Sequence, residues 1–205
     1  LLPLTENKPK PLVNILGKPV IDYVKDALVN ADVNEIIVTT GYQGDSLVEL
    51  VKQWNDDLAI ECSVNQENSP MGTAGSVKLL QSKLTETFFV ASGDAVISSN
   101  LKLLQDAHRN SGAVVTMGLW EVEDPTQFGI VGLSPKHNGS LNGQLHEGFV
   151  VKFQEKPTVD AAFSRIINAG LYIVEPEVME LIPAGQKYDF SRQLFPHLLE
   201  LGLPI

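Results

Sequence analysis

Residues 35–64 read EIIVTTGYQGDSLVELVKQWNDDLAIECSV and contain a strand, a helix and a second strand in succession. The β-branched run from Glu35 to Thr40 is typical of a buried strand, and Gly41 ends it. Asp45 to Trp54 carries apolar residues at helical spacing, and Leu58 to Val64 is a second short apolar run. Two strands joined by a helix in this way predict a parallel βαβ unit.

The alternation of helices and strands continues on both sides of this unit. Pro19 is placed to open a helix, because apolar residues recur at helical spacing from Val20 to Ala31. Four further segments are predicted as helix, strand, helix and strand: Gly75 to Leu84, Thr87 to Ala91, Leu101 to Asn110 and Ala113 to Trp120. Elements that alternate at this spacing predict a three-layer α/β domain.

The character of the sequence changes after Phe128. The segments expected here are strands at Ile130-Val131, Val150 to Phe153 and Ile166 to Val174, and helices at Glu177 to Leu181 and Phe190 to Leu201. Residues 135–143 are rich in Gly, Asn and Ser, which is typical of an exposed turn. We therefore expect one domain over residues 1–205, with two halves, 1–120 and 121–205, that share one sheet.

The composition excludes several classes of function. The 205 residues include 15 Lys and Arg against 25 Asp and Glu, a net charge of −10, and general binding of nucleic acid needs a positive surface. A polyphosphate can still bind where a few cations gather in one cleft. No apolar run is long enough to cross a bilayer and no signal peptide is recognisable, so we expect no membrane partner. The single cysteine, Cys62, fits a cytoplasmic location and is expected to be a buried small hydrophobe.

The first candidate for chemistry is the loop from Pro3 to Leu12, in which Pro9 and Pro11 flank Lys10. Prolines restrict the backbone, so the loop would present Lys10 rigidly, and lysine acts as a point charge on a phosphate oxygen. A surface loop with solvated lysines is an equal alternative.

Two further candidates follow predicted strands. Small residues from Pro70 to Gly75 precede a helix, where the backbone can approach a ligand; a helix-capping turn is the alternative. This loop is neither G-x-G-x-x-G nor a Walker loop. Asp94, in Ser92-Gly93-Asp94, is placed to point into the ligand crevice of an α/β sheet and to hold Mg²⁺ together with phosphate oxygens; a turn or N-cap role is the alternative.

The last candidates lie in the second half of the chain. The strand that ends at Phe153 is followed by the charged pair Glu155-Lys156, and Asn168-Ala169-Gly170 interrupts an apolar strand. Such a triplet indicates close approach of a ligand or a β-bulge. Four histidines show no metal-ligand spacing and no pattern of Ser, His and Asp, so solvated roles are expected for them: His108, His137, His146 and His197.

In this order along the chain, the five clusters resemble the sugar nucleotidyltransferase family, which includes mannose-1-phosphate guanylyltransferases and glucose-1-phosphate thymidylyl- and uridylyltransferases. The most specific part is Leu4-Thr5…Pro9-Lys10-Pro11-Leu12…Gly17-Lys18-Pro19, and the resemblance covers essentially the whole chain. It implies a Rossmann-like α/β/α sandwich with a mostly parallel mixed sheet, the nucleotide-diphospho-sugar transferase fold. Residues 1–120 would form its nucleotide-binding half and residues 121–205 its sugar-phosphate-binding half.

The resemblance also implies a role for each candidate residue. On the nucleotide side, Lys10 would contact the triphosphate and Asp94 would bind Mg²⁺. The nucleobase would contact Gly72, Thr73 and Gly75, with Glu67 on the same wall. On the sugar side, Glu155 and Lys156 would hold the sugar hydroxyls and the sugar phosphate, Asn168 and Gly170 would line the sugar pocket, and Gly129 would place its backbone against the sugar.

The implied reaction joins a nucleoside triphosphate to a hexose 1-phosphate and releases pyrophosphate, with Lys10, Asp94 and Lys156 as the catalytic residues. The sugar phosphate oxygen is already an anionic nucleophile, so positioning and electrostatics suffice without a general base. Mannose 1-phosphate and GTP are the favoured pair because residues 72–75 look most like a guanylyltransferase. Glucose 1-phosphate with UTP or dTTP, and a non-catalytic regulatory relative, are the alternatives, and the resemblance leaves a homo-oligomer open.

Other classes fit less well, and two parts of the family pattern are missing. A dehydrogenase would need G-x-G-x-x-G, and a glycosyltransferase its usual Asp-x-Asp, which is not seen at Asp94. The family's glycine-rich loop ending in Gly-Thr-Arg would precede Leu1, and its second metal-binding aspartate would follow Ile205. We therefore expect these residues to be part of a longer active enzyme, clipped at both ends.

Overall fold

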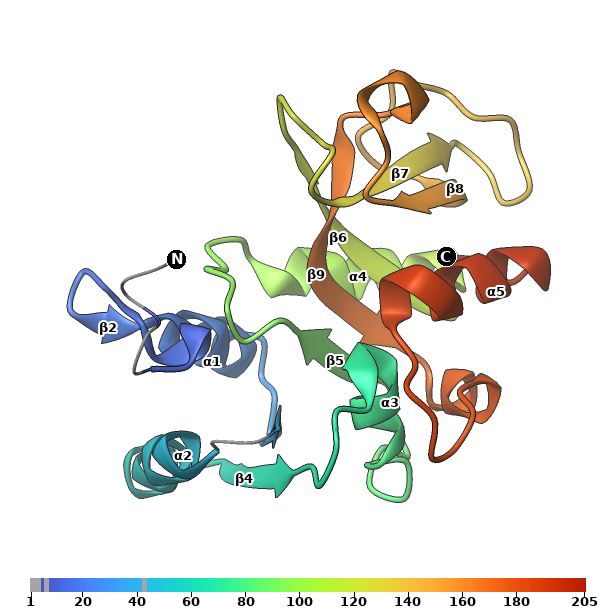
Figure 1. Cartoon of the computed structure of the whole chain (residues 1–205). Helices are drawn as coiled ribbons and strands as arrows, with labels where there is room; N and C mark the ends of the chain where they lie inside the picture. Colours follow the sequence, from blue (N-terminus) through green and yellow to red (C-terminus); the bar gives the residue numbers. More distant parts are fainter. Residues whose placement is uncertain (1–4, 6–7, 42–43) are drawn as a thin grey trace. The chain divides into compact units, whose positions relative to one another are not determined.

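The computed structural model describes Thr5, residues 8–41 and residues 44–205 (Figure 1). Leu4 and residues 6–7, which belong to the N-terminal stretch noted in the sequence, lie outside the described residues. The chain forms two compact units, Leu1–Pro70 with Ala91–Leu103 and Met71–Val90 with Leu104–Ile205. These units cut across the expected halves at residue 120, and the functional assignment of those halves stays a prediction.

The first unit contains the predicted βαβ arrangement. Its elements are η1 (Lys10–Leu12), β1 (Asn14–Ile15), β2 (Lys18–Pro19), α1 (Val20–Asn30), β3 (Glu35–Thr40), α2 (Asp45–Asp57) and β4 (Glu61–Gln66). β1 and β2 form a short antiparallel hairpin, and β3 and β4 pair in parallel with Glu35 opposite Glu61. The parallel pair joined by α2 confirms the interpretation of residues 35–64.

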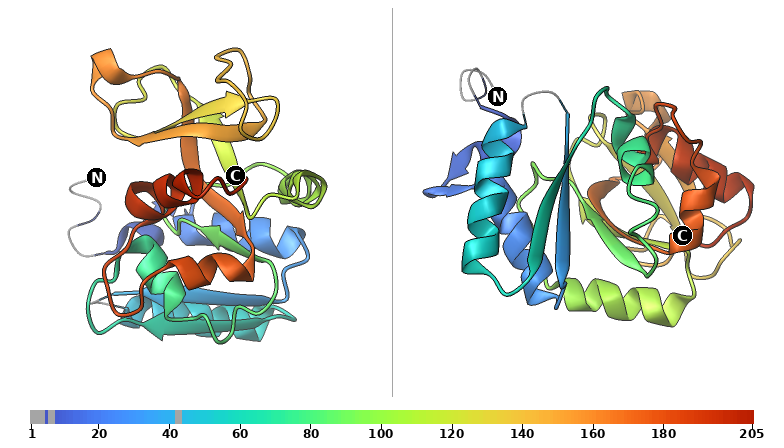
Figure 2. Two further views of the ribbon diagram at one scale, coloured as in Figure 1. Left: turned by 90° about the vertical axis from the view of Figure 1, so that its right-hand side faces the viewer. Right: turned by 90° about the horizontal axis from the view of Figure 1, so that it is seen from below.

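Helix α2 forms where the sequence predicts it because its apolar residues share one face. Leu47, Val51 and Trp54 follow helical spacing and are buried. The indole N–H of Trp54 donates to the Asp22 carboxylate of α1 at 2.8 Å, which satisfies the one polar atom of this buried side chain. The helix also packs alongside β4, as both views of Figure 2 show.

Cys62 on β4 is a buried structural residue, as the sequence predicts. The Asn55 carboxamide of α2 pairs with both backbone groups of Cys62, at 2.7 Å to the N–H and 2.7 Å to the carbonyl. Burial raises the pKa of the Cys62 thiol, although the charge of Lys25 opposes this. The reactive thiolate is therefore disfavoured.

The second unit holds most of the remaining elements; β5 and α4 each cross a boundary between the units. The elements are α3 (Gly72–Lys78), β5 (Phe88–Ala91), α4 (Leu101–Ser111), β6 (Val115–Glu121), β7 (Gly129–Ser134), β8 (Phe149–Glu155), η2 (Val159–Ala161), β9 (Ile166–Val174), η3 (Pro176–Leu181), η4 (Phe190–Leu194) and α5 (Phe195–Glu200). The strand expected at 166–174 is confirmed at both ends.

The strands of this unit form one five-stranded sheet in the order β5-β9-β7-β8, with β6 also paired to β9. The α/β class is confirmed, and the sheet joins strands of both expected halves, β5 and β6 with β7, β8 and β9. The pairing, however, differs from the mostly parallel sheet that was expected. β6 with β9, β7 with β8, and β7 with β9 are antiparallel, whereas the parallel pair β3 and β4 forms a separate sheet. β7 and β8 are joined by a loop and not by a crossover helix, which is consistent with their antiparallel pairing.

Two helices differ most from the expected boundaries. The helix expected over 75–84 begins at Gly72 and ends at Lys78. The helix expected over 190–201 is divided into η4, a π-helical turn, and α5, which has Pro196 in its first turn. Proline has no N–H to continue the preceding hydrogen-bond ladder, so a change of helix type at this point is consistent with the sequence.

The core of the second unit is aromatic where η4 and α5 pack on the sheet. Phe195 and Phe190 are 0% and 2% exposed, and Tyr172 of β9 is 6% exposed. Their ring centroids lie 5.0–5.8 Å apart, and Phe153 of β8 makes an edge-to-face contact with Phe195 at 5.4 Å. This cluster fixes the C-terminal helices against β8 and β9, the strands that carry several candidate residues.

Candidate functional site

The loops that carry Lys10 and Asp94 lie against each other in the first unit. Lys10 opens η1 directly after Pro9, and Asp94 follows the end of β5. A Cβ atom placed on Gly93 would lie 3.7 Å from Pro11 Cγ and in contact with Ile21. Because Pro11 and Gly93 adjoin Lys10 and Asp94 in sequence, the fold brings a cationic and an anionic candidate to one place.

Both charged side chains are exposed to solvent. The Ser92 hydroxyl donates to Asp94 Oδ1 at 2.6 Å, and for Lys10 the described residues provide no ion pair. No group of three or more His, Cys, Asp and Glu side chains suited to a metal occurs among the described residues. One exposed carboxylate nevertheless fits Mg²⁺, which keeps several waters and takes its other ligands from substrate phosphates.

Glu67 lies at the carboxyl end of the parallel strand pair. It follows β4 directly, and its backbone N–H donates to the Thr40 carbonyl at 2.8 Å, which extends the pairing of β3 and β4 by one bond. Ligands of open α/β sheets bind at this edge. The position is therefore consistent with the wall of a nucleotide site, which stays a prediction.

The glycine-threonine loop, residues 71–75, packs against a distant segment of the second unit. The carbonyl oxygen of Tyr188 accepts the N–H groups of Ala74 and Gly75, both at 2.9 Å, and the N–H of Tyr188 donates to the Met71 carbonyl at 2.8 Å. Gly72 has φ +74°, and a Cβ there would lie 2.7 Å from the Tyr188 carbonyl oxygen. Only glycine suits this backbone and this gap.

Asp189 caps the start of α3 from across the chain. Its Oδ1 accepts the Thr73 N–H at 3.0 Å and the Thr73 hydroxyl at 3.3 Å. The first backbone donors of α3 thus already have protein acceptors, which come from Asp189 and Tyr188 and not from a side chain of the loop itself. The nucleobase contact of Gly72, Thr73 and Gly75 stays a prediction. Asp189 and Tyr188 were not identified from the sequence.

Gly129 and Glu155 face each other across β7 and β8. They are paired in register, and a Cβ on Gly129 would lie 2.9 Å from Glu155 Oε2 and 2.6 Å from Phe153 Cζ. The absence of a side chain at Gly129 is what leaves room for the Glu155 carboxylate. Two predicted sugar-binding residues are therefore neighbours.

Lys156 has an unusual backbone. It has φ +45°, its N–H donates to the Phe128 carbonyl at 2.9 Å, and Pro157 follows it. A non-glycine residue in the left-handed region costs on the order of 1–2 kcal/mol. Strain of this kind persists where the surrounding structure imposes it and is concentrated at functional positions. Its side chain is exposed, as a phosphate-binding lysine requires.

Asn168 organises a polar cluster on β9. Its Nδ2 donates to the Tyr172 hydroxyl at 2.8 Å and to Ser191 Oγ at 3.1 Å, and its Oδ1 accepts the Gly170 N–H at 2.8 Å. The register of β9 with β6 shifts here, opposite Gly118, and Gly170 has φ +71°. The bulge expected for the triplet is confirmed, and the carboxamide orientation is set by the protein itself.

Tyr172 links this cluster to Glu155. Burial raises the pKa of Tyr172 to about 12, and the negative charge of Glu155 adds to the increase, whereas hydrogen bonds with Asn168 and Ser191 oppose it. Glu155 therefore lies close enough to Tyr172 to act on it electrostatically. The second unit brings Gly129, Glu155 and Asn168 to one region of the sheet.

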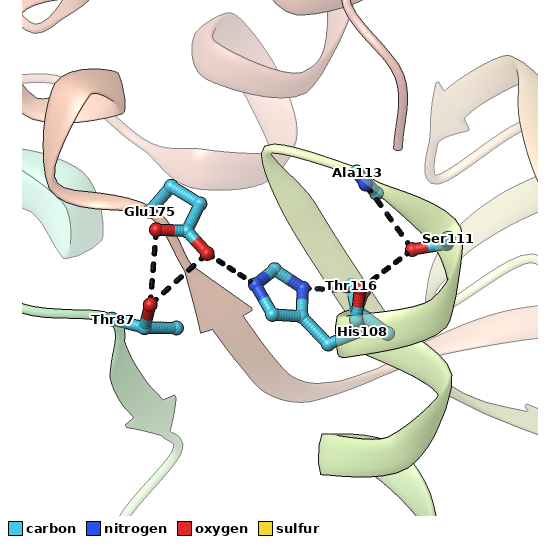
Figure 3. A network of polar contacts seen from close by, with 6 residues as sticks. All are labelled: Thr87, His108, Ser111, Ala113, Thr116 and Glu175. Carbon is cyan, nitrogen blue, oxygen red and sulfur yellow. Dashed lines mark hydrogen bonds and ion pairs between the residues drawn. The ribbon is translucent and has the colours of Figure 1, made fainter.

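His108 corrects the expectation of solvated histidines. It is 6% exposed, and its Nδ1 and Nε2 each lie 2.8 Å from an oxygen, Thr116 Oγ1 and Glu175 Oε1 (Figure 3). Glu175 also accepts the Thr87 hydroxyl at 3.0 Å. A buried imidazole is stable only when its nitrogens find partners, and Glu175, 67 residues later in the chain, gave no local signal.

This network is structural. A hydroxyl, an imidazole and a carboxylate in a row resemble a nucleophilic triad in order. Thr116, however, does not line the neighbouring cavity of about 570 Å³, which is bounded by His108, Glu175 and Thr87 among others. A second cavity, of about 630 Å³, lies near Asp124 and Arg165. Neither cavity includes a candidate residue predicted from the sequence, so the candidate site rests on the contacts above.

The fold and these contacts define an α/β protein whose candidate residues are suited to phosphate and sugar groups. The chain belongs to the nucleotidyl transferase family, whose model matches residues 1–204. It is similar to the mannose-1-phosphate guanylyltransferase catalytic subunit beta of Xenopus tropicalis, at 32% identity over 98% of this chain and 53% of that protein. It is also similar to the UTP–glucose-1-phosphate uridylyltransferase of Synechocystis, at 31% identity over the same shares.

Solved structures share the fold. The HddC protein of Yersinia pseudotuberculosis, solved with GMP-PN, matches with a TM-score of 0.73 at 23% identity over 96% of this chain and 80% of its own. A UDP-glucose pyrophosphorylase solved with UDP-glucose matches with a TM-score of 0.78 at 19% identity over 100% of this chain and 83% of its own. The chain spans about half the length of the curated relatives that it matches. Among the described helices, none has the length and apolar character needed to cross a membrane.

Proposed function

We propose that this chain is the larger part of the catalytic domain of a sugar-1-phosphate nucleotidyltransferase. The observation that carries the proposal is the clustering of residue types suited to this reaction. A lysine loop and an aspartate loop pack together in the first unit. A glutamate, a glycine and an asparagine gather in the second unit. Membership of the nucleotidyl transferase family supports the proposal.

The favoured substrates are mannose 1-phosphate and GTP. Several similar proteins at 31–32% identity are named mannose-1-phosphate guanylyltransferases, among them those of Xenopus tropicalis and Kluyveromyces lactis. Glucose 1-phosphate with UTP or dTTP is the second candidate, because a uridylyltransferase matches at 31% identity. The base is selected by a few hydrogen bonds, and residues 72–75 with Glu67 are proposed to provide them.

The reaction needs charge compensation more than proton transfer. The anionic oxygen of the sugar phosphate attacks the α-phosphorus, a new P–O bond forms, and the bond to the β-phosphate oxygen breaks as pyrophosphate leaves with the electron pair. Two polyanions must approach each other, so Lys10 on the triphosphate and Lys156 on the sugar phosphate would offset their repulsion. Mg²⁺, held at Asp94, would neutralise further phosphate charge.

The second unit would orient the sugar. The Glu155 carboxylate can accept hydrogen bonds from sugar hydroxyls, and it lies beside Gly129, where a Cβ atom would be 2.9 Å from Glu155 Oε2. Asn168 and Gly170 are held by bonds within the protein. A site that is already ordered loses less entropy when the substrate binds, so this arrangement favours a defined attack geometry.

Pyrophosphate release by the full-length protein tests the proposal. The assay uses Mg²⁺, a series of sugar 1-phosphates and each common nucleoside triphosphate, with Asp94→Ala in parallel. Release with one pair that is lost in Asp94→Ala supports the reaction and names the substrates. Nucleotide binding without release from any pair would favour the alternative, a non-catalytic regulatory relative.

A cytoplasmic location, without nucleic-acid or membrane partners, belongs to the same proposal. It is supported by the net charge of −10 and by the unpaired Cys62. A homo-oligomer is compatible with this proposal, and light scattering of the full-length protein would measure its oligomeric state.

A further inference from the structure

One segment of the second unit, Tyr188 to Ser191, contacts two groups of candidate residues. At one end, Asp189 accepts both the N–H and the hydroxyl of Thr73, at 3.0 and 3.3 Å. The Phe190 N–H donates in return to Thr73 Oγ1 at 3.0 Å. Thr73 therefore has its hydroxyl orientation and its backbone position set by this segment.

At the other end, Ser191 holds the carboxamide of β9. Its Oγ accepts an N–H of Asn168 at 3.1 Å, and it also hydrogen-bonds Tyr172. With Oδ1 occupied by the Gly170 N–H at 2.8 Å, these contacts define which way the Asn168 amide faces. Asp189 and Ser191 are two residues apart on the chain, and they contact two residues that are far apart in sequence, Thr73 at the start of α3 and Asn168 on β9.

The segment is stiff enough to serve both ends. Phe190, between them, is 2% exposed and packs on Tyr172 and Phe195 with centroids at 5.1 and 5.8 Å. The Gln193 carboxamide oxygen accepts the Asp189 N–H at 2.7 Å, which fixes the backbone at the start of η4. π-helical turns such as η4 are frequent at functional sites.

We infer that Asp189 and Ser191 are positioning residues, Asp189 for the nucleotide loop through Thr73 and Ser191 for the sugar side through Asn168. The inference rests on the proposed function and extends it to residues with no assigned role. Neither side chain is a catalytic residue, because each acts through another protein group. Their effects are separable, since each one supports a different substrate.

The test measures the Michaelis constants for the nucleotide and for the sugar phosphate separately in the full-length protein, with GTP and mannose 1-phosphate as the first pair of probes. Asp189→Ala should raise KM for the nucleotide about tenfold, the equivalent of one charge-assisted hydrogen bond, and leave KM for the sugar phosphate within about twofold. Ser191→Ala should raise KM for the sugar phosphate about three- to tenfold and leave KM for the nucleotide within about twofold. In both variants kcat should change less than KM.

Conservative variants separate positioning from folding. Asp189→Asn keeps an acceptor oxygen and Ser191→Thr keeps the hydroxyl, so each should recover most of the lost affinity. Asp106→Asn, on the exposed face of α4, is the matched control and should leave both constants unchanged. Thermal unfolding of every variant accompanies the kinetics.

The outcomes are distinct. The inference is supported if each alanine variant raises KM for only its own substrate and the conservative variant recovers most of the lost affinity. Equal changes in both constants that track the fall in Tm, or no change at all, would overturn it while the wild-type activity still supports the proposed function. Wild-type protein that turns over no pair of substrates would overturn the proposed function, and this inference with it.

Discussion

The two units carry their candidate residues in opposite ways. In the first unit, Lys10 and Asp94 are exposed charges on loops, and Asp94 has one short side-chain bond, to Ser92. In the second unit, Asn168 and Glu155 lie half-buried on strands, in contact with Tyr172, Ser191 or Gly129. We expect the first unit to contribute charged side chains that act on phosphate groups, and the second unit to contribute polar groups held in fixed positions. Changes in the first should therefore affect rate alone, and changes in the second should affect rate and stability together.

The largest effect expected is at Asp94. Asp94→Asn keeps the shape and removes the charge, so kcat should fall by about 10²–10³, as for the loss of one electrostatic contact at a reacting phosphate. Because the side chain is exposed, Tm should stay within about 1 °C of wild type. Steady-state pyrophosphate release and thermal unfolding check the two halves of this prediction. A large fall in Tm would contradict the description of this unit as a source of charge alone.

Lys156 combines an exposed charge with a strained backbone, so its substitution should affect both rate and stability. Lys156→Met and Lys156→Gly each remove the cation, so each should lower kcat/KM by about 10². Only glycine relieves the positive φ of +45°, so Lys156→Gly should also gain about 1 kcal/mol in the free energy of unfolding. The methionine variant, which keeps the strain, is the control. Urea unfolding that gives both variants equal stability would show that the left-handed backbone carries no cost.

The features of the structure that could be predicted from the sequence are the ones set by residues close together in the chain. Local patterns predicted the parallel pair β3 and β4, the limits of β9 and the burial of Cys62, because helical and strand periodicity is set by residues close in sequence. The turn that holds Asp94 could be predicted on the same basis, since an acidic residue directly after an apolar strand is a local feature.

Contacts between distant segments could not be predicted in this way. Asp189 caps α3 at Thr73, 116 residues earlier, and His108 bonds to Glu175, 67 residues later. Asp189 before Phe190 reads locally as the start of its own helix, and a histidine on an amphipathic helix reads as solvated. The antiparallel partners of β9 were missed for the same reason, because β6 and β7 are separated from β9 by long stretches of chain.

A smaller effect is expected where the second unit is tightly packed. A Cβ at position 129 would lie 2.6 Å from Phe153 Cζ, so Gly129→Ala should destabilise the protein by about 1–3 kcal/mol and raise KM for the sugar phosphate. Gly143→Ala is the matched control, because no atom lies within 4 Å of a Cβ there. Chemical denaturation of the two variants measures the difference. If they prove equally stable, the close contact between β7 and β8 does not constrain the site.

The smallest effect concerns the proton of Tyr172. Its pKa is raised from 10.0 to about 12, chiefly by burial, so the folded state holds the proton more tightly than the unfolded state does. This contribution to stability is complete below pH 10 and is lost as the pH rises towards 12, by about 2 kcal/mol at pH 11.5. Tyr172→Phe cannot titrate and loses the hydrogen bonds to Asn168 and Ser191, so it should be about 1 kcal/mol less stable than wild type at pH 8. The difference should shrink and then reverse between pH 10 and 11.5 in urea unfolding. Parallel stability curves over that range would instead mean that burial does not hold the Tyr172 phenol neutral, and that this part of the second unit is more open to water than the structure shows.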